Sequence, residues 1–329
     1  MSETRAAVAP SPLAPAAPRL QGLTLVRRYG LLTLLVLLVG VSEYLYPRFL
    51  DWQNVRNILS QNALVGIVAV GMTFVMITGG FDLSVGSIYA AGATVYASLA
   101  VAGWPVAAAA AMTLLVGVVA GLVNGLIVTR LRVNPFVATL GTMTAYSGLA
   151  LIYSNSSPFV VEDPGFTRLG RGTALGLQIS IWLLFAFFAA GQFVLSKTVY
   201  GRSVFAIGGN NEASRLAGLQ TEWLRTSTYV LSGACAAIAG MIIASRLAIG
   251  QADIGGTMSL DAIAVVVIGG TSLLGGEGAV WRTAIGVLIV AVLTNLLDSL
   301  AVDANYQLVI KGVIVIAAVA LDARVRAGR

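Results

Sequence analysis

The sequence predicts an all-α fold, a polytopic transmembrane bundle of about ten helices with both ends of the chain in the cytoplasm. Of the 329 residues, 57% are hydrophobic and only 10% are charged, whereas a soluble globular chain carries about 25% charged residues. Long apolar runs recur along the chain, and basic residues are unequally distributed among the segments that join them. These few polar groups could not cover the surface of a soluble protein of this length. The excess apolar surface must therefore face lipid.

The chain opens with residues 1–27, which are rich in Ala and Pro and cannot build a core. We expect a disordered cytoplasmic tail there, with a cleaved signal peptide as the alternative. The apolar run that follows lacks a clear cleavage site, so we interpret it as a retained helix. At roughly 20 residues per crossing, the apolar runs predict helices at 30–46, 58–78, 86–102, 105–128, 135–153, 179–196, 226–244, 259–274, 282–300 and 305–321.

These helices define a membrane domain over 28–322, followed by a short cytoplasmic tail at 323–329. The longest inner connection is 197–225. The predicted helices 86–102 and 259–274 are short and flanked by glycine, so either one could be broken or re-entrant.

Charge asymmetry sets the orientation. With the N-terminus inside, five basic residues fall in outer segments: Arg48, Arg56, Arg168, Arg171 and Arg246. Only Lys311 falls within a predicted helix. The other fourteen of the 20 basic residues fall in cytoplasmic segments: Arg5, Arg19, Arg27, Arg28, Arg130, Arg132, Lys197, Arg202, Arg215, Arg225, Arg282, Arg324, Arg326 and Arg329. This split follows the positive-inside rule for an even number of crossings.

The composition excludes several kinds of chemistry. The chain has no histidine, which removes histidine triads, histidine metal sites and histidine proton relays. Its single cysteine, Cys235, forms no disulfide within the chain and no multi-cysteine metal site. Neither Lys197 nor Lys311 lies in a phosphate-binding loop motif, so any ATP must be bound by another chain. The basic residues do not cluster into a nucleic-acid patch, and we predict no catalytic residue and no metal site.

Glycine spacing indicates how the helices pack. Gly117, Gly121 and Gly125 stand four apart, and Ala236 and Gly240 repeat that spacing. Small residues at this spacing let helix backbones approach closely in lipid.

Two loops share the pattern G-G-x-x-L-x-x-G. The first contains Gly79, Gly80, Asp82 and Gly86, and the second contains Gly269, Gly270, Gly275 and Gly276. The pattern is consistent with a duplication or with chance in a chain so rich in glycine.

Three stretches carry a family resemblance: VGMTFVMITGGFDLSVGS from Val70, GRSVFAIGGNNEASRLAG from Gly201 and LDAIAVVVIGGTSLLGGEG from Leu260. They resemble the ribose, arabinose and related monosaccharide permeases of ATP-binding-cassette importers, and the similarity extends from about residue 50 to 322. The resemblance implies a type II importer-like permease in the bacterial inner membrane. It implies three protein partners: a second permease copy or close paralogue, a cytoplasmic ATPase that holds ATP and magnesium, and a periplasmic sugar-binding protein.

The alternative is an ion-coupled secondary transporter of small polar solutes, which would also explain buried acids. It would not explain the Gly201–Gly218 stretch. In this stretch Asn210 or Asn211 can cap a short helix and Gly218 can end it. The resemblance assigns the segment to coupling with the ATPase, through Gly201, Arg202, Asn211, Glu212, Ala213, Arg215, Ala217 and Gly218.

Polar residues on apolar helices are the candidates for a translocation path. They are Asn62, Asn124, Thr139, Thr142, Tyr146, Asn295, Asp298 and Tyr306, and helix-packing hydrogen bonds are an equally good explanation for each. Asp82 and Asp261 lie near predicted helix ends, where capping or tying down a loop is favoured over substrate contact. On the outer face, we expect 154–178 and 245–258, with Arg168, Arg171 and Arg246, to receive the binding protein.

The ten-helix prediction has a direct test. A reporter enzyme that functions only in the cytoplasm, fused after Arg329, should be active because an even number of crossings returns the C-terminus to the cytoplasm. Activity of a periplasm-only reporter at the same position would show that the predicted number of crossings is wrong.

Overall fold

The computed structural model describes residues 19–327, which form helices with almost no sheet. Ten helices lie where the sequence predicts them: α1 (Arg19–Leu45), α2 (Trp52–Ile77), α3 (Val85–Val101), α4 (Val106–Thr129), α5 (Pro135–Tyr153), α7 (Ile179–Lys197), α10 (Thr221–Leu247), α11 (Met258–Ile268), α12 (Val280–Ser299) and α13 (Ala304–Ala327). Three shorter helices complete the described chain: α6 (Pro164–Arg171), α8 (Val199–Gly209) and α9 (Asn211–Leu216), of which α9 is the short capped helix predicted before Gly218.

Three predicted boundaries are wrong. The helix α1 begins at Arg19, so residues 19–27 are helical where a disordered tail was predicted, while the rest of that predicted tail lies outside the described residues. The helix α13 continues to Ala327, into the predicted C-terminal tail. The helix α11 ends at Ile268 and not at 274, because Gly269 and Gly270, the latter at φ +80°, turn the chain out of the helix.

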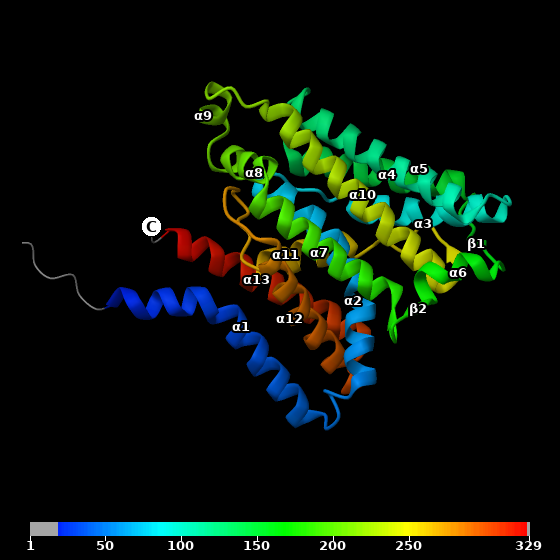
Figure 1. Cartoon of the computed structure of the whole chain (residues 1–329), viewed down its shortest axis with the longest axis horizontal. Helices are drawn as coiled ribbons and strands as arrows, with labels where there is room; N and C mark the ends of the chain where they lie inside the picture. The colour runs from blue at the N-terminus through cyan, green and yellow to red at the C-terminus, as the bar shows by residue number, and fades with distance from the viewer. Residues whose placement is uncertain (1–18, 328–329) are drawn as a thin grey trace, which may run out of the picture.

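Six of the described helices are long and apolar enough to cross a bilayer: α2, α4, α5, α7, α10 and α12. The apolar stretch Gly30–Leu45 and the helices α3 and α11 are shorter. The multi-pass helical fold is therefore confirmed, whereas ten full crossings remain a prediction. Figure 1 shows α8 and α9 at one end of the bundle and α6, β1 and β2 at the opposite end. The start of α1 and the end of α13 lie on the same side as α8 and α9 (Figure 1).

Two small antiparallel strand pairs accompany α6 at that opposite end. The strand β1 (Phe159–Val160) pairs with β4 (Ile249–Gly250), and β2 (Thr173–Ala174) pairs with β3 (Leu177–Gln178). The first pair ties the α5–α6 connection to the end of α10. These two-residue strands hold the connections around α6 together and do not form a sheet layer of the fold.

The centre of the bundle is α10, which packs against α2, α3 and α4. Small residues make this closeness possible. A Cβ at Gly117, Gly121 or Gly125 of α4 would collide with α10 at Gly233, Tyr229 or Thr226, respectively. Further along α10, a Cβ at Gly240 would collide with the carbonyl of Tyr89 in α3. The packing role predicted for the glycine spacing is therefore confirmed.

We predict that Gly121→Leu lowers the free energy of unfolding by at least about 1–3 kcal/mol, because it forces a side chain into the α4–α10 backbone contact. The measurement is thermal unfolding of the purified protein in detergent. Gly40→Leu is the control, because nothing lies within 4 Å of a Cβ at Gly40 in α1. Equal unfolding temperatures for the two variants would contradict this packing.

Candidate functional site

The non-helical segment 78–84 between α2 and α3 is held by one face of α10. Arg225 donates from Nη2 to the Gly79 carbonyl (3.0 Å), and the Tyr229 hydroxyl donates to the Phe81 carbonyl (3.2 Å). One turn further along α10, the Ser232 hydroxyl donates to the Asp82 carboxylate (2.8 Å). Spacings of four and three residues place these three donors on the same side of the helix. The segment is therefore anchored to α10 at three successive points.

Asp82 is fully buried and accepts three hydrogen bonds from neutral donors. They come from the Ser232 hydroxyl, the Ser84 hydroxyl (2.6 Å) and the Ser84 backbone N–H (3.1 Å). The last bond places the carboxylate at the N-terminus of α3, where the helix dipole favours negative charge. The structure thus gives Asp82 the geometry of a loop anchor.

The same network includes two of the path candidates. Asn124 of α4 donates to the Ser84 hydroxyl (2.6 Å), and the Tyr146 hydroxyl of α5 donates to the Ala120 carbonyl (3.0 Å) and lies 3.3 Å from Asn124 Oδ1. The structure brings Asp82, Asn124 and Tyr146 together, although the sequence placed Asp82 among the loop residues and the other two among the path candidates. Asn124 is fully buried, and the network joins the start of α3 to α4, α5 and α10.

The other path candidates are dispersed. Thr139 and Thr142 bond to carbonyls of their own helix, with Thr139 also 3.5 Å from the Phe81 carbonyl, and Asn62 bonds to Ile58 of its own helix.

Near the C-terminal end of the described chain, Asn295 exchanges hydrogen bonds with Asn54 of α2, and Gln307 of α13 donates to Asp298. Tyr306 is 69% exposed on α13. The structure therefore does not bring the predicted set together as one path, and most of its members hold helices to one another or cap local carbonyls.

Asp261 pairs with the lysine that the sequence places inside a membrane helix. Lys311 Nζ of α13 lies 3.5 Å from Asp261 Oδ1 in the first turn of α11. An ionised side chain among apolar helices needs a partner. The pair thus joins α13 to α11, a contact that the sequence-based preference for capping at Asp261 missed.

The two glycine-rich loops that share a sequence pattern meet in space. The Gly276 N–H donates to the Ile77 carbonyl at the end of α2 (2.8 Å). Gly275 lies against Gly79, so a Cβ on Gly275 would come within 2.8 Å of the Gly79 nitrogen. Gly79, Gly275 and Gly276 have φ values of +72°, +89° and +76°, which glycine adopts without strain. We call this contact of 77–80 with 274–277 the glycine junction.

The inner connection forms the short helix predicted between Asn210 and Gly218, which is α9, and a second helix, α8, before it. Asn210 separates the two helices and caps α9, since its Oδ1 accepts from the Ala213 N–H (2.9 Å), and this assigns the cap to Asn210, not to Asn211. Gly218 follows α9 at φ +87°, the left-handed conformation of a helix C-terminus. Gly201 is buried against the last carbonyls of α7, so it is an internal packing residue.

The helix α9 is exposed and carries both charged and apolar side chains on its surface. Glu212 and Arg215 form an ion pair of 2.6 Å, and the hydrogen bonds from Arg215 lower the pKa of the Glu212 carboxyl. Ala213 and Ala217 are exposed, and so is Leu216, with 76% of its surface accessible. Leu216 is a surface leucine on a helix outside the apolar runs, and no sequence pattern singles it out. Beside α9, a polar cleft of 710 Å³ separates it from the α4–α5 connection and the start of α10.

A smaller pocket of 270 Å³ lies where the N-terminal turns of α3 and α11 approach each other beside α5. Ser259 of α11 accepts from the Gly86 N–H (3.0 Å) and donates to the Leu83 carbonyl (2.6 Å), which joins the two helix starts. Ser87, Ser147 and the exposed Asp253 supply further polar groups. None of these residues was a path candidate, because their closeness depends on the β4–α11 connection folding against α3.

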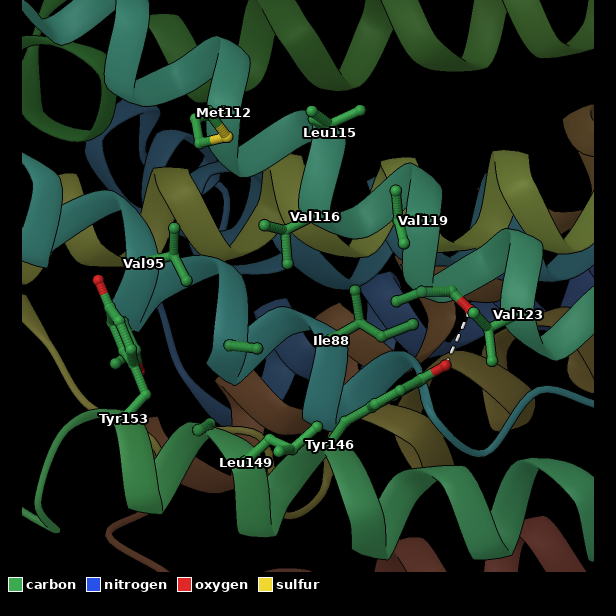
Figure 2. Close-up of a pocket in the computed structure, with 14 residues that line it drawn as sticks. Ile88, Val95, Met112, Leu115, Val116, Val119, Val123, Tyr146, Leu149 and Tyr153 are labelled. Carbon is green, nitrogen blue, oxygen red and sulfur yellow. Dashed lines mark hydrogen bonds between the residues drawn. The ribbon is translucent and has the colours of Figure 1, made fainter.

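An apolar cavity elsewhere in the described chain is unsuited to a polar ligand. It has a volume of 440 Å³ between α3, α4 and α5. Figure 2 shows Tyr146 and Tyr153 among aliphatic side chains, with the Tyr146 hydroxyl already hydrogen bonded. Tyr153 bonds to Ser98, and Thr94 bonds to its own helix. Its few polar groups are therefore committed to protein partners.

On the outer face, Arg246 is not free for a partner. It donates to the Ser60 carbonyl (2.9 Å) and lies 3.3 Å from the Ser180 hydroxyl, so it joins α10 to α2 and α7. Arg171 donates to the Arg246 carbonyl (2.6 Å) and is exposed, as is Arg168 on α6. The exposed basic surface is thus smaller than the sequence predicts.

Comparison with known proteins identifies the family. Residues 54–319 match the family described as branched-chain amino acid transport system / permease component. The ribose import permease protein RbsC of Bacillus subtilis is 41% identical over 290 residues, covering 88% of this chain and 90% of that protein. RbsC of Escherichia coli strain K12 is 40% identical over 305 residues (91% and 94%), and the L-arabinose transport system permease protein AraH of the same strain is 38% identical over 305 residues (90% and 90%).

No solved structure matches the chain. The match to the family covers most of the chain, and the relatives are similar over nearly their whole length. The resemblance of the three sequence stretches to this family is therefore confirmed. The chain belongs to the branched-chain-type family of transport-system permease components, and it is a multi-pass protein of the bacterial inner membrane.

Proposed function

We propose that the chain is the membrane-spanning subunit of an ATP-driven importer of monosaccharides, with ribose or a similar pentose as the substrate. The observation that carries this proposal is the 36–41% identity to ribose and arabinose permeases along about nine tenths of the chain. The family description refers to branched-chain amino acids. The relatives named for sugars are matched over nearly full length, so we favour a sugar.

Energy for transport is proposed to come from a separate ATPase at the cytoplasmic end. The chain contains no phosphate-binding loop motif, so ATP and magnesium would be held by that partner. The exposed helix α9 and the adjoining 710 Å³ cleft offer it a docking surface. Leu216, Ala213 and Ala217 supply apolar contact, and the Glu212–Arg215 pair supplies charge at a fixed position.

The sugar path is proposed to include the 270 Å³ pocket beside α3, α5 and α11. Hydroxyl and carboxylate groups suit sugar hydroxyls, and the short helices α3 and α11 begin there. Transporters often place substrate groups at the ends of discontinuous helices. A second copy of the chain and a periplasmic sugar-binding protein at the α6 end complete the proposed assembly.

An ion-coupled secondary transporter is the second candidate, favoured only by the buried acids. Asp82 receives its hydrogen bonds from serine, and Asp261 is paired with Lys311. Both acids therefore have structural partners that explain their presence without ion transport.

We predict that Ala217→Trp blocks docking of the ATPase, because the indole would stand on the exposed surface of α9. Sugar-stimulated ATP hydrolysis by the reconstituted complex and capture of the ATPase should both be lost, while membrane insertion is retained. Val199→Trp is the control, since Val199 is exposed on α8 outside α9. Full stimulation in Ala217→Trp would show that coupling uses another surface.

The pocket has its own test in whole-cell uptake of labelled ribose. Asp253→Leu should raise the sugar concentration for half-maximal uptake about tenfold, since a hydrogen bond to a charged group contributes about 1.5–3 kcal/mol. Asp51→Asn removes a carboxylate from the exposed start of α2, outside the pocket and outside the two segments expected to receive the binding protein, and should leave uptake unchanged. Equal uptake by the two variants would exclude the pocket from the path.

A further inference from the structure

The end of α8 rests directly on the glycine junction. A Cβ on Gly208 would collide with the Ile77 carbonyl oxygen and come within 2.5 Å of the Gly276 nitrogen. The next residue, Gly209, has nothing within 4 Å of a Cβ. Two adjacent glycines therefore have opposite surroundings, and only Gly208 requires the absence of a side chain.

All three segments at this point touch through their main chains. The Gly276 N–H donates to the Ile77 carbonyl (2.8 Å), and a Cβ on Gly275 would come within 3.0 Å of the Gly208 oxygen. The end of α8, the end of α2 and the second glycine-rich loop thus meet with no side chain between them. Interior packing is dense and barely compressible, so a contact of this kind leaves no rotamer change to absorb a displacement.

The segment after the junction leads to the polar pocket. Gly79 lies three residues before Asp82, whose network includes Asn124 and Ser232. The adjacent Leu83 carbonyl and Gly86 N–H both bond to Ser259 at the start of α11. A displacement at Gly79 would therefore pull on both helix starts that line the pocket.

We propose that Gly208 is a positioning residue that transmits movement of α8 and α9 to the 78–84 segment and so to the pocket. This inference rests on the proposed coupling to an ATPase and assigns it a specific route. The bulk of a single methyl group at Gly208 would separate α8 from α2, whereas the exposed surface of α9 that docks the ATPase would be unchanged.

The test compares Gly208→Ala with its neighbour Gly209→Ala in the full complex with ATPase and binding protein. Gly208→Ala should still capture the ATPase and retain its unstimulated hydrolysis, but sugar-stimulated hydrolysis and uptake should fall at least tenfold. Gly209→Ala should behave as wild type. Normal stimulated hydrolysis and uptake in a Gly208→Ala complex would overturn the inference. Failure of the wild-type chain to bind any ATPase would instead overturn the proposed function.

A second measurement avoids any risk that Gly208→Ala does not fold. Spin labels are attached to cysteines at exposed positions in two pairs, Val199→Cys with Leu274→Cys and Val199→Cys with Leu131→Cys, and labelled protein is diluted with unlabelled protein. The native Cys235 is fully buried and stays unlabelled. On ATP binding, the 199–274 distance should stay constant while the 199–131 distance changes. A changed 199–274 distance, or an unchanged 199–131 distance, would overturn the inference.

Discussion

The structure depends on satisfying the main-chain polar groups of two non-helical segments inside an apolar bundle. A helix bonds its own backbone, but 78–84 and 269–279 do not, and lipid offers no replacement partners. Arg225, Tyr229 and Ser259 bond to main-chain groups of the first segment, and the Gly276 N–H of the second bonds to the Ile77 carbonyl of α2. Each non-helical segment thus finds its hydrogen-bond partners on adjacent elements. Because two of these partners, Arg225 and Tyr229, belong to α10, this helix lies beside the 78–84 segment at the centre of the bundle.

Close approach of helices follows from the same requirement. For Arg225, Tyr229 and Ser232 to reach the 78–84 segment, α10 must lie close to the α2–α3 break, and the glycine stripe of α4 lets a third helix pack against α10 without displacing it. The buried network from Asp82 to Tyr146 then joins four helices through hydrogen bonds. Such a network is costly if any member is unpaired, so it fixes one arrangement of the bundle.

The proposed function depends on how the central helices connect the surfaces at the two ends of the bundle. At one end, the end of α8 lies against the glycine junction, and the polar pocket lies at the starts of α3 and α11. The outer loops are fastened by two-residue strand pairs and by Arg246, which leaves Arg168 and Arg171 exposed beside α6. The surfaces at both ends of the molecule are thus held in place by the same central helices.

The sequence by itself determined the fold class, the location of ten helices, the packing of the Gly117–Gly125 stripe and the family. Composition, apolar length and helical spacing are local properties that need no knowledge of neighbours. Only the tertiary structure decided which polar residues meet: it separated Asn62, Asn295 and Tyr306, joined Asp82 to Asn124 and Tyr146, paired Asp261 with Lys311, and assembled a pocket from Ser87, Ser147 and Asp253. Helical spacing places each polar residue of a helix on one face of that helix. Which faces oppose one another depends on how non-helical segments distant in sequence fold back, and no local pattern encodes that.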